Sequence, residues 1–168
     1  MRSLVLTGIA ITQAICAARG DTPLPPPSRI TATSPNGQIR AVSDPKAGTH
    51  VEDAKKHKVL WRLPDWHRAM FVANDGKHLV TEYDGLNLIP TDYTDDLVLL
   101  TFWREGRKIR EIRVRDFLPD HSILALTMGL HYYWGRIESI DPQGRLKVVR
   151  ADGKTFFFDV TTGNETKA

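Results

Sequence analysis

The side chains best suited to hold a ligand are aromatic residues that stand next to histidines. Trp66 precedes His67, and a second cluster reads HYYW at 131–134. Tyrosine and tryptophan combine a flat apolar face with one polar group, so such rings can stack on a sugar or grip a peptide. The candidate binding residues are Trp66, His67, His131, Tyr132, Tyr133 and Trp134. The alternative is that these rings fill a β core, where their OH and NH groups find local partners.

The histidines and acidic residues lack the spacing of a metal site. Six histidines, at positions 50, 57, 67, 78, 121 and 131, form no HxH, HxxxH or HExxH pattern. The acidic stretch DYTDD at 92–96 offers the oxygen ligands that calcium prefers, but it does not have the D-x-D-x-D-G order of a calcium loop. We therefore predict a solvated acidic loop, with neither a metal ion nor a cofactor.

Asp120, His121 and Ser122 have the residue types of a hydrolytic triad, but they are adjacent in the sequence. Members of a triad approach one another from separate segments of the chain, so adjacency argues against that role. The sequence also has no G-x-S-x-G motif. We interpret Asp120 as a helix cap and predict no catalytic residue.

The first 18 residues have the order of a secretory signal. Arg2 is followed by an uncharged run from position 3 to position 18, which ends in small residues. This run is shorter and more polar than the roughly 20 apolar residues of a membrane span. We predict a signal peptide at 1–18, export to the periplasm or beyond, and no transmembrane span after processing. A buried N-terminal helix and lipid attachment at Cys16 are the alternatives.

Composition limits the remaining classes of protein. The formal net charge of the 168 residues is +3, and it falls to +2 when Arg2 is removed. Such a balanced chain does not favour nucleic acid as a partner. The predicted cleavage also removes the only cysteine. A chain of about 150 residues can bury nearly 70% of its unfolded surface, so its core can suffice without disulfides.

Proline and threonine dominate the segment after the predicted signal, and turn signals punctuate the rest. We predict an extended tether at 19–35 and a single antiparallel β domain at 36–168. Pairs such as Asp-Gly supply the positive φ that tight hairpins need. Between these turns lie short segments rich in β-branched and aromatic residues. The predicted strands are 38–43, 58–63, 68–73, 77–83, 97–103, 107–114, 134–140, 145–150 and 154–160.

Two hairpins and one short helical segment complete the predicted fold. EGR at 105–107 is expected to reverse the chain between 97–103 and 107–114, and ADG at 151–153 to join the last two strands. In the final strand, Phe156 and Phe158 should point to one face and Phe157 to the other. The segment 116–128 contains a proline and a possible cap at Asp120, which predicts short helical turns. The fold class is therefore all-β, built from antiparallel hairpins in a meander.

Two stretches resemble the blade repeats of β-propeller proteins. They are the segments 37–63 and 134–163, and the second ends in DVTTG, similar to the Asp-x-x-Thr-Gly that often closes a blade. The layout is also similar to that of small exported bacterial proteins. The resemblance implies four-stranded blades of roughly 40 residues. About three such units fit after position 36, which is too few for a closed ring. We expect an open, propeller-like or sandwich-like β domain; a ring completed by several chains is the alternative.

These patterns predict an exported, non-catalytic binding domain that holds its ligand or partner on an aromatic face. The expected partner is a protein or a cell-envelope polysaccharide. One alternative is an envelope-polymer hydrolase that uses Asp and His residues on loops. The other is a structural subunit that completes a β assembly by oligomerisation.

Overall fold

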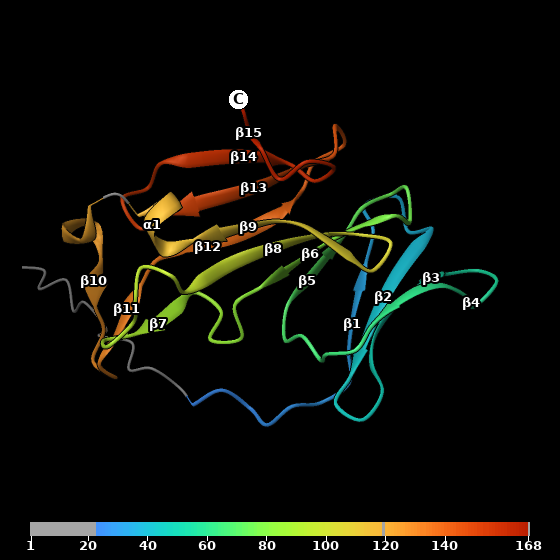
Figure 1. Ribbon diagram of the computed structural model, residues 1–168, viewed down its shortest axis with the longest axis horizontal. Helices are drawn as coiled ribbons and strands as arrows, with labels where there is room; N and C mark the ends of the chain where they lie inside the picture. Colours follow the sequence, from blue (N-terminus) through green and yellow to red (C-terminus); the bar gives the residue numbers. More distant parts are fainter. Residues whose placement is uncertain (1–22, 119, 168) are drawn as a thin grey trace, which may run out of the picture.

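A computed structural model describes residues 23–118 and 120–167 of the chain. The predicted signal peptide at 1–18, including Cys16, lies outside the described residues. The described chain forms four separate antiparallel sheets and no closed barrel, which confirms the all-β class (Figure 1). The likeness to propeller blades stays a prediction.

The first sheet begins before the expected domain boundary at 36. Its strands, in spatial order, are β1 (Ile30–Thr33), β2 (Ile39–Asp44), β3 (Gly48–Asp53) and β4 (Lys58–Leu63). β1 lies in the segment assigned to the tether, yet it pairs with β2 from Ile30↔Ser43 onward. Ile30 and Ala32 pack on the core while Thr31 and Thr33 stay exposed, so a half-buried strand replaces the end of the tether.

The second sheet contains the expected 97–114 hairpin. Its strands are β5 (Met70–Val72), β6 (His78–Glu82), β8 (Val98–Arg104) and β9 (Arg107–Arg113). Glu105 and Gly106 both have positive φ, at 47° and 82°, as the two central residues of a tight type I′ hairpin turn do. Arg104 and Arg107 pair directly across that turn. The predicted hairpin is confirmed.

The third sheet ends the chain. Its strands are β12 (Gly135–Ile140), β13 (Arg145–Arg150), β14 (Thr155–Asp159) and β15 (Glu165–Thr166). Phe156 and Phe158 pack on the core, whereas Phe157 lies on the other face beneath the Arg145 guanidinium, 4.6 Å from the ring centroid. The alternation predicted for this strand is therefore confirmed.

A small three-stranded sheet joins distant parts of the chain. Its spatial order is β10 (Ala125–Leu126), β11 (His131–Tyr133) and β7 (Leu88–Pro90). Between β9 and β10 the chain forms α1 (Val114–Phe117) and a 3-10 turn, η1 (His121–Ile123). The Asp120 carboxylate accepts a hydrogen bond from the Ser122 backbone N–H, which confirms Asp120 as a cap. Helical turns were expected at 116–128, and they occur from α1 to η1.

The second sheet lies between the first and the third, and each of its faces packs against one of them. On one face, Leu79 packs with Val51 of the first sheet. On the other, Val80 and Phe102 pack with Leu146 of the third sheet, in the larger core cluster. Successive residues of β6 thus pack into two different cores, because side chains alternate between the two faces of a strand.

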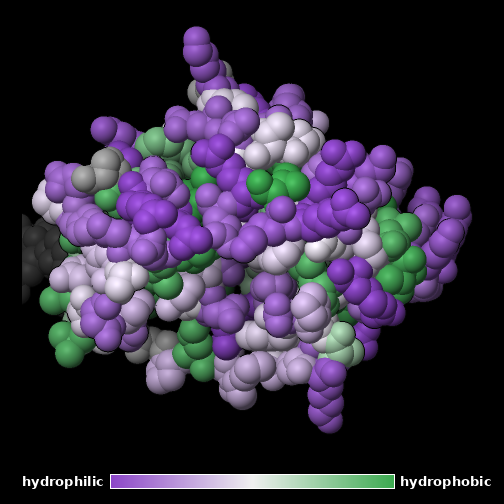
Figure 2. Space-filling model, viewed as in Figure 1, coloured by the Kyte–Doolittle hydropathy of each residue, from purple (hydrophilic) through white to green (hydrophobic). Residues whose placement is uncertain are grey.

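The outer surface is mostly hydrophilic in the view of Figure 2, where the apolar residues form small separate areas. One of these areas lies at the end of the molecule that Figure 1 assigns to β10 and β11. Leu126, Met128 and Leu130 are exposed there by 55%, 70% and 66%. β10 and the turn that follows it therefore present three exposed large apolar side chains.

Candidate functional site

Tyr132 lies on β11, in the middle of the small sheet. It pairs with Leu126 of β10 and with Ile89 of β7. Side chains alternate along a strand, so Tyr132 points to one face of the sheet while His131 and Tyr133 point to the other. The HYY run therefore divides between two surfaces.

The acidic loop approaches the Tyr132 face. Its backbone is fixed by turn hydrogen bonds: the Tyr93 N–H donates to Pro90 O at 3.2 Å, and the Leu97 N–H donates to Thr94 O at 3.0 Å. Arg115 donates its backbone N–H to Asp95 O at 3.1 Å. These bonds set the positions of Tyr93 and Asp95.

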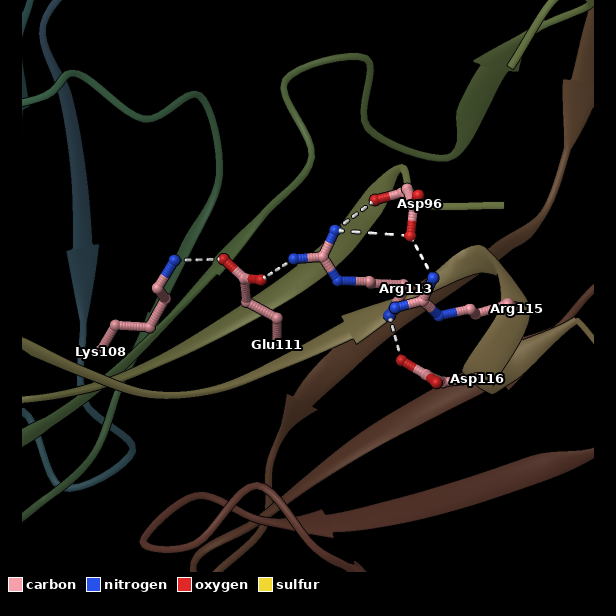
Figure 3. Close-up of polar contacts among 6 residues, drawn as sticks. All are labelled: Asp96, Lys108, Glu111, Arg113, Arg115 and Asp116. Carbon is pink, nitrogen blue, oxygen red and sulfur yellow. Dashed lines mark hydrogen bonds and ion pairs between the residues drawn. The ribbon is translucent and has the colours of Figure 1, made fainter. Parts of the chain in front are cut away.

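A charged network holds the end of this loop (Figure 3). Arg113 donates to the Asp96 backbone oxygen at 2.8 Å, and the Arg115 guanidinium contacts the Asp96 carboxylate. Glu111 bridges Lys108 and Arg113, and the Lys108 ammonium is the main cause that holds the pKa of the Glu111 carboxyl below its usual range. Carboxylates thus pair with two cations of β9, Lys108 and Arg113, and with Arg115 of α1, which favours a structural role for this network.

The capped turn η1 brings His121 to the same place. Its Nε2 lies 3.2 Å from Asp95 Oδ1, and its ring centroid lies 5.5 Å from that of Tyr93. Tyr93 and Tyr132 meet edge to face, with centroids 5.9 Å apart. Such T-shaped contacts are favourable for aromatic rings, so these four side chains form one cluster.

The cluster lines an open pocket of about 310 Å³. Burial, and after it the charge of Asp95, raises the pKa of the Tyr93 phenol above its usual value. Tyr93 therefore keeps its proton at neutral pH and can donate a hydrogen bond beside an accepting carboxylate. The residues that line the pocket are Thr91, Tyr93, Asp95, His121, Leu124 and Tyr132. We call this set the tyrosine pocket.

His131 lines a different pocket, on the other face of the small sheet. This pocket measures about 510 Å³, and its walls include Tyr83, Leu88 and Pro90. The N-terminal residues Pro23 and Leu24 form another part of its wall. His131 and Tyr132 are thus neighbours in sequence that serve separate cavities.

Trp134, expected on the binding face, is instead a core residue. It is fully buried, and its indole N–H donates to Leu86 O at 2.7 Å. Its ring packs edge to face on Phe117 at 6.0 Å. Tyr133 is half-buried and is hydrogen-bonded to Arg136 at the start of β12. Neither residue lines the tyrosine pocket.

Trp66 and His67 lie in the connection between β4 and β5, apart from the tyrosine pocket. The Trp66 indole donates to Ser28 O at 2.8 Å. The His67 ring lies 6.2 Å from that of Trp103, and burial lowers its pKa, so the ring is neutral at physiological pH. The structure does not bring Trp66 and Tyr132 into one site.

Sequence reasoning missed Tyr93 and assigned other roles to Asp95 and His121. It treated Asp95 as part of a solvated loop and gave His121 neither a catalytic nor a metal-binding role. The only signal was the pairing of an acidic, tyrosine-containing loop with a histidine near a cap. Among the described residues, no cluster of three or more His, Cys, Asp or Glu side chains has the arrangement of a metal site.

Comparison with known proteins assigns no family to the chain. No protein-family model matches the chain, and a search of the curated proteins found no significant match. Within 23–118 and 120–167, none of the helices has the length and apolar character needed to cross a membrane. The functional argument therefore rests on the pockets themselves.

Proposed function

We propose that the chain is an exported, non-catalytic binding domain that holds a saccharide of the cell envelope in the tyrosine pocket. The observation that carries this proposal is the cluster of Tyr93 and Tyr132 with the His121–Asp95 pair. A sugar ring has apolar C–H faces and a rim of hydroxyls. Tyrosine rings fit the faces, and a carboxylate, an imidazole and a phenol fit the rim.

The charge inventory of the pocket favours binding over cleavage. Most glycoside hydrolases use two carboxyl groups that flank the scissile bond. Asp95 is the one carboxylate among the residues that line the tyrosine pocket. A single exposed carboxylate can orient a hydroxyl, but it does not supply both the acid and the nucleophile or base of that reaction.

The test is calorimetric titration of the purified protein with chito-oligosaccharides and soluble peptidoglycan fragments. We expect binding that Tyr132→Ala weakens by about tenfold or more, since a ring contact and its buried area are lost. Tyr133→Ala is the matched control, because Tyr133 is the next residue but faces the other side of the sheet. Absence of binding to every probe, or equal losses in both variants, contradicts the proposal.

The rival function is hydrolysis of an envelope polymer. It draws on the contact of 3.2 Å between His121 Nε2 and Asp95 Oδ1, because a carboxylate that orients a histidine is a common general-base arrangement. Mass spectrometry of the same protein–saccharide mixtures distinguishes the two functions. Cleavage products that disappear with His121→Asn favour the hydrolase, whereas intact saccharide at the end of incubation favours the binding domain.

A further inference from the structure

Residues 23–29 run as an extended strap along one edge of the molecule. In Figure 1 this blue segment passes beneath the sheets, from the end where β7 and β11 lie to the start of β1. It has no helix or strand, and all seven residues are exposed. Its sequence is PLPPPSR. Proline fixes φ, and a residue that precedes proline is held extended, so the segment is biased towards a polyproline II conformation.

Side chains of the β4–β5 connection hold the strap by its backbone carbonyls. The Trp66 indole N–H donates to Ser28 O at 2.8 Å, and the Arg68 guanidinium donates to Pro25 O at 2.9 Å. The guanidinium also lies 5.0 Å from the Trp66 ring centroid, so each donor orients the other. In the described part of the chain, these two side chains donate no other hydrogen bond.

The spacing of the two acceptors matches the geometry of a polyproline helix. Polyproline II has three residues per turn, so the carbonyls of residues 25 and 28 face the same side. A polyproline helix has no internal hydrogen bonds, so its carbonyls are free to accept bonds from outside the segment. An indole and a guanidinium that donate hydrogen bonds to carbonyls one turn apart can therefore bind a proline-rich chain.

The other end of the strap contacts an apolar pocket. Pro23 and Leu24 form part of the wall of the cavity of about 510 Å³ that Tyr83 and His131 also line. Gly85 belongs to the same wall, and a Cβ there would lie 2.4 Å from the Tyr83 ring. The absence of a side chain at this position thus allows the tyrosine to lie against the loop. The strap therefore has an apolar contact at one end and a polar contact at the other.

We propose that this surface is a binding site for extended proline-rich peptides, and that the chain's own residues 23–29 are the ligand it holds in cis. The two donors form hydrogen bonds with main-chain carbonyls of the strap and with none of its side chains. A proline-rich peptide from another chain presents the same acceptors at the same spacing. The site is separate from the tyrosine pocket and takes a different class of ligand.

The strap competes with any peptide that arrives from solution. A tethered ligand acts at an effective concentration in the millimolar range, so a free peptide binds weakly while the strap is in place. The strap is exposed along its whole length and lies outside both core clusters. It can therefore leave the surface without opening the β domain.

Fluorescence anisotropy with a labelled peptide TPLPPPSR, the sequence of residues 22–29, tests the proposal on the full chain. The triple variant Pro25→Gly, Pro26→Gly, Pro27→Gly weakens the strap, because glycine removes the bias towards an extended chain. We expect this variant to bind the probe about tenfold more tightly than the unaltered chain. The affinity of a control peptide, TPLGGGSR, should differ little between the triple variant and the unaltered chain.

A second substitution in the strap-weakened variant identifies the site. Trp66→Phe keeps an aromatic ring but removes the indole donor. We expect it to abolish most of the increase in peptide affinity and to leave the circular dichroism spectrum unchanged. Tyr132→Ala is the matched control and should leave peptide binding intact. The proposal is overturned if the triple variant binds the peptide no more tightly than the unaltered chain. It is also overturned if the increase in affinity persists after Trp66→Phe.

Discussion

The four-stranded sheets and the small sheet are built in different ways. Each strand of the first and third sheets pairs with its neighbour in the sequence, whereas the small sheet pairs β7 with β11 across an intervening hairpin and helix. The larger sheets bury the core, and the small sheet separates the two pockets described above. Strands that are close in the sequence thus build the scaffold, where the one skip is from β6 to β8 over β7. The more distant pairing of β7 with β11 brings candidate ligand-binding side chains together.

Replacement of Trp134 should have the largest effect, because this residue joins the two regions. Trp134→Ala leaves a cavity in the larger core and removes the bond to Leu86 O, so we expect a loss of about 3–5 kcal/mol in the free energy of unfolding. Denaturant titration measures it, with Trp134→Phe as the milder control. A loss below about 1 kcal/mol would show that the small sheet is not anchored through this indole.

Glu82 is the last residue of β6, an internal strand of the second sheet, and it should make stability depend on pH. Burial raises the pKa of its carboxyl from 4.5 to about 7. The folded protein therefore holds a proton that the unfolded chain releases between these values, and its stability falls as the pH rises from about 4.5 to 7.

Glu82→Gln should remove that dependence. Above pH 7 we expect the variant to be more stable by on the order of 3 kcal/mol, and at pH 4 the two proteins should differ little in stability. Thermal unfolding across the pH range measures the difference. An equal shift at pH 4 and pH 8 would mean that packing, and not ionisation, is responsible.

Arg113→Ala should have a smaller effect, confined to the loop that serves the tyrosine pocket. It removes the donor to Asp96 O and one cation of the network in Figure 3. We expect a loss of about 1 kcal/mol, reduced in about 1 M salt. Arg107→Ala, on the same strand, is the control. Equal losses of stability in the two variants would show that Arg113 anchors the loop no more than an ordinary surface charge does.

Tyr132→Ala should change stability least of all. The ring is partly exposed at the edge of the larger core, so we expect a loss of about 1 kcal/mol or less in the free energy of unfolding. Denaturant titration, in parallel with Trp134→Ala, gives the direct comparison. A loss as large as that of Trp134→Ala would make Tyr132 a core residue and remove it from the candidate site.

Hairpins were predictable because their information is local. The β13–β14 pair has a glycine at a positive φ in its turn and several large apolar residues on each strand. β3 was missed because Val51 is its only large apolar residue, although it is a central strand. Its burial comes from neighbours on both sides, which the strand's own sequence does not reveal.

The candidate site was only partly predictable because adjacent residues have different environments. Tyr132 and Trp134 differ by two positions, yet one lines a pocket and the other is fully buried. The partners that decide this, β7 and the 91–97 loop, lie far away in the sequence. The contact between His121 and Asp95 likewise depends on how α1 and η1 return the chain to the acidic loop.

The backbone of Trp134 connects the small sheet to the third sheet. Its N–H donates to Asn87 O at 3.1 Å, and its carbonyl accepts from the Ala151 N–H at 3.0 Å. A ligand that orders the small sheet would therefore restrain a turn that it never touches. Hydrogen exchange at the Ala151 amide would then report whether a cavity beside the small sheet is occupied.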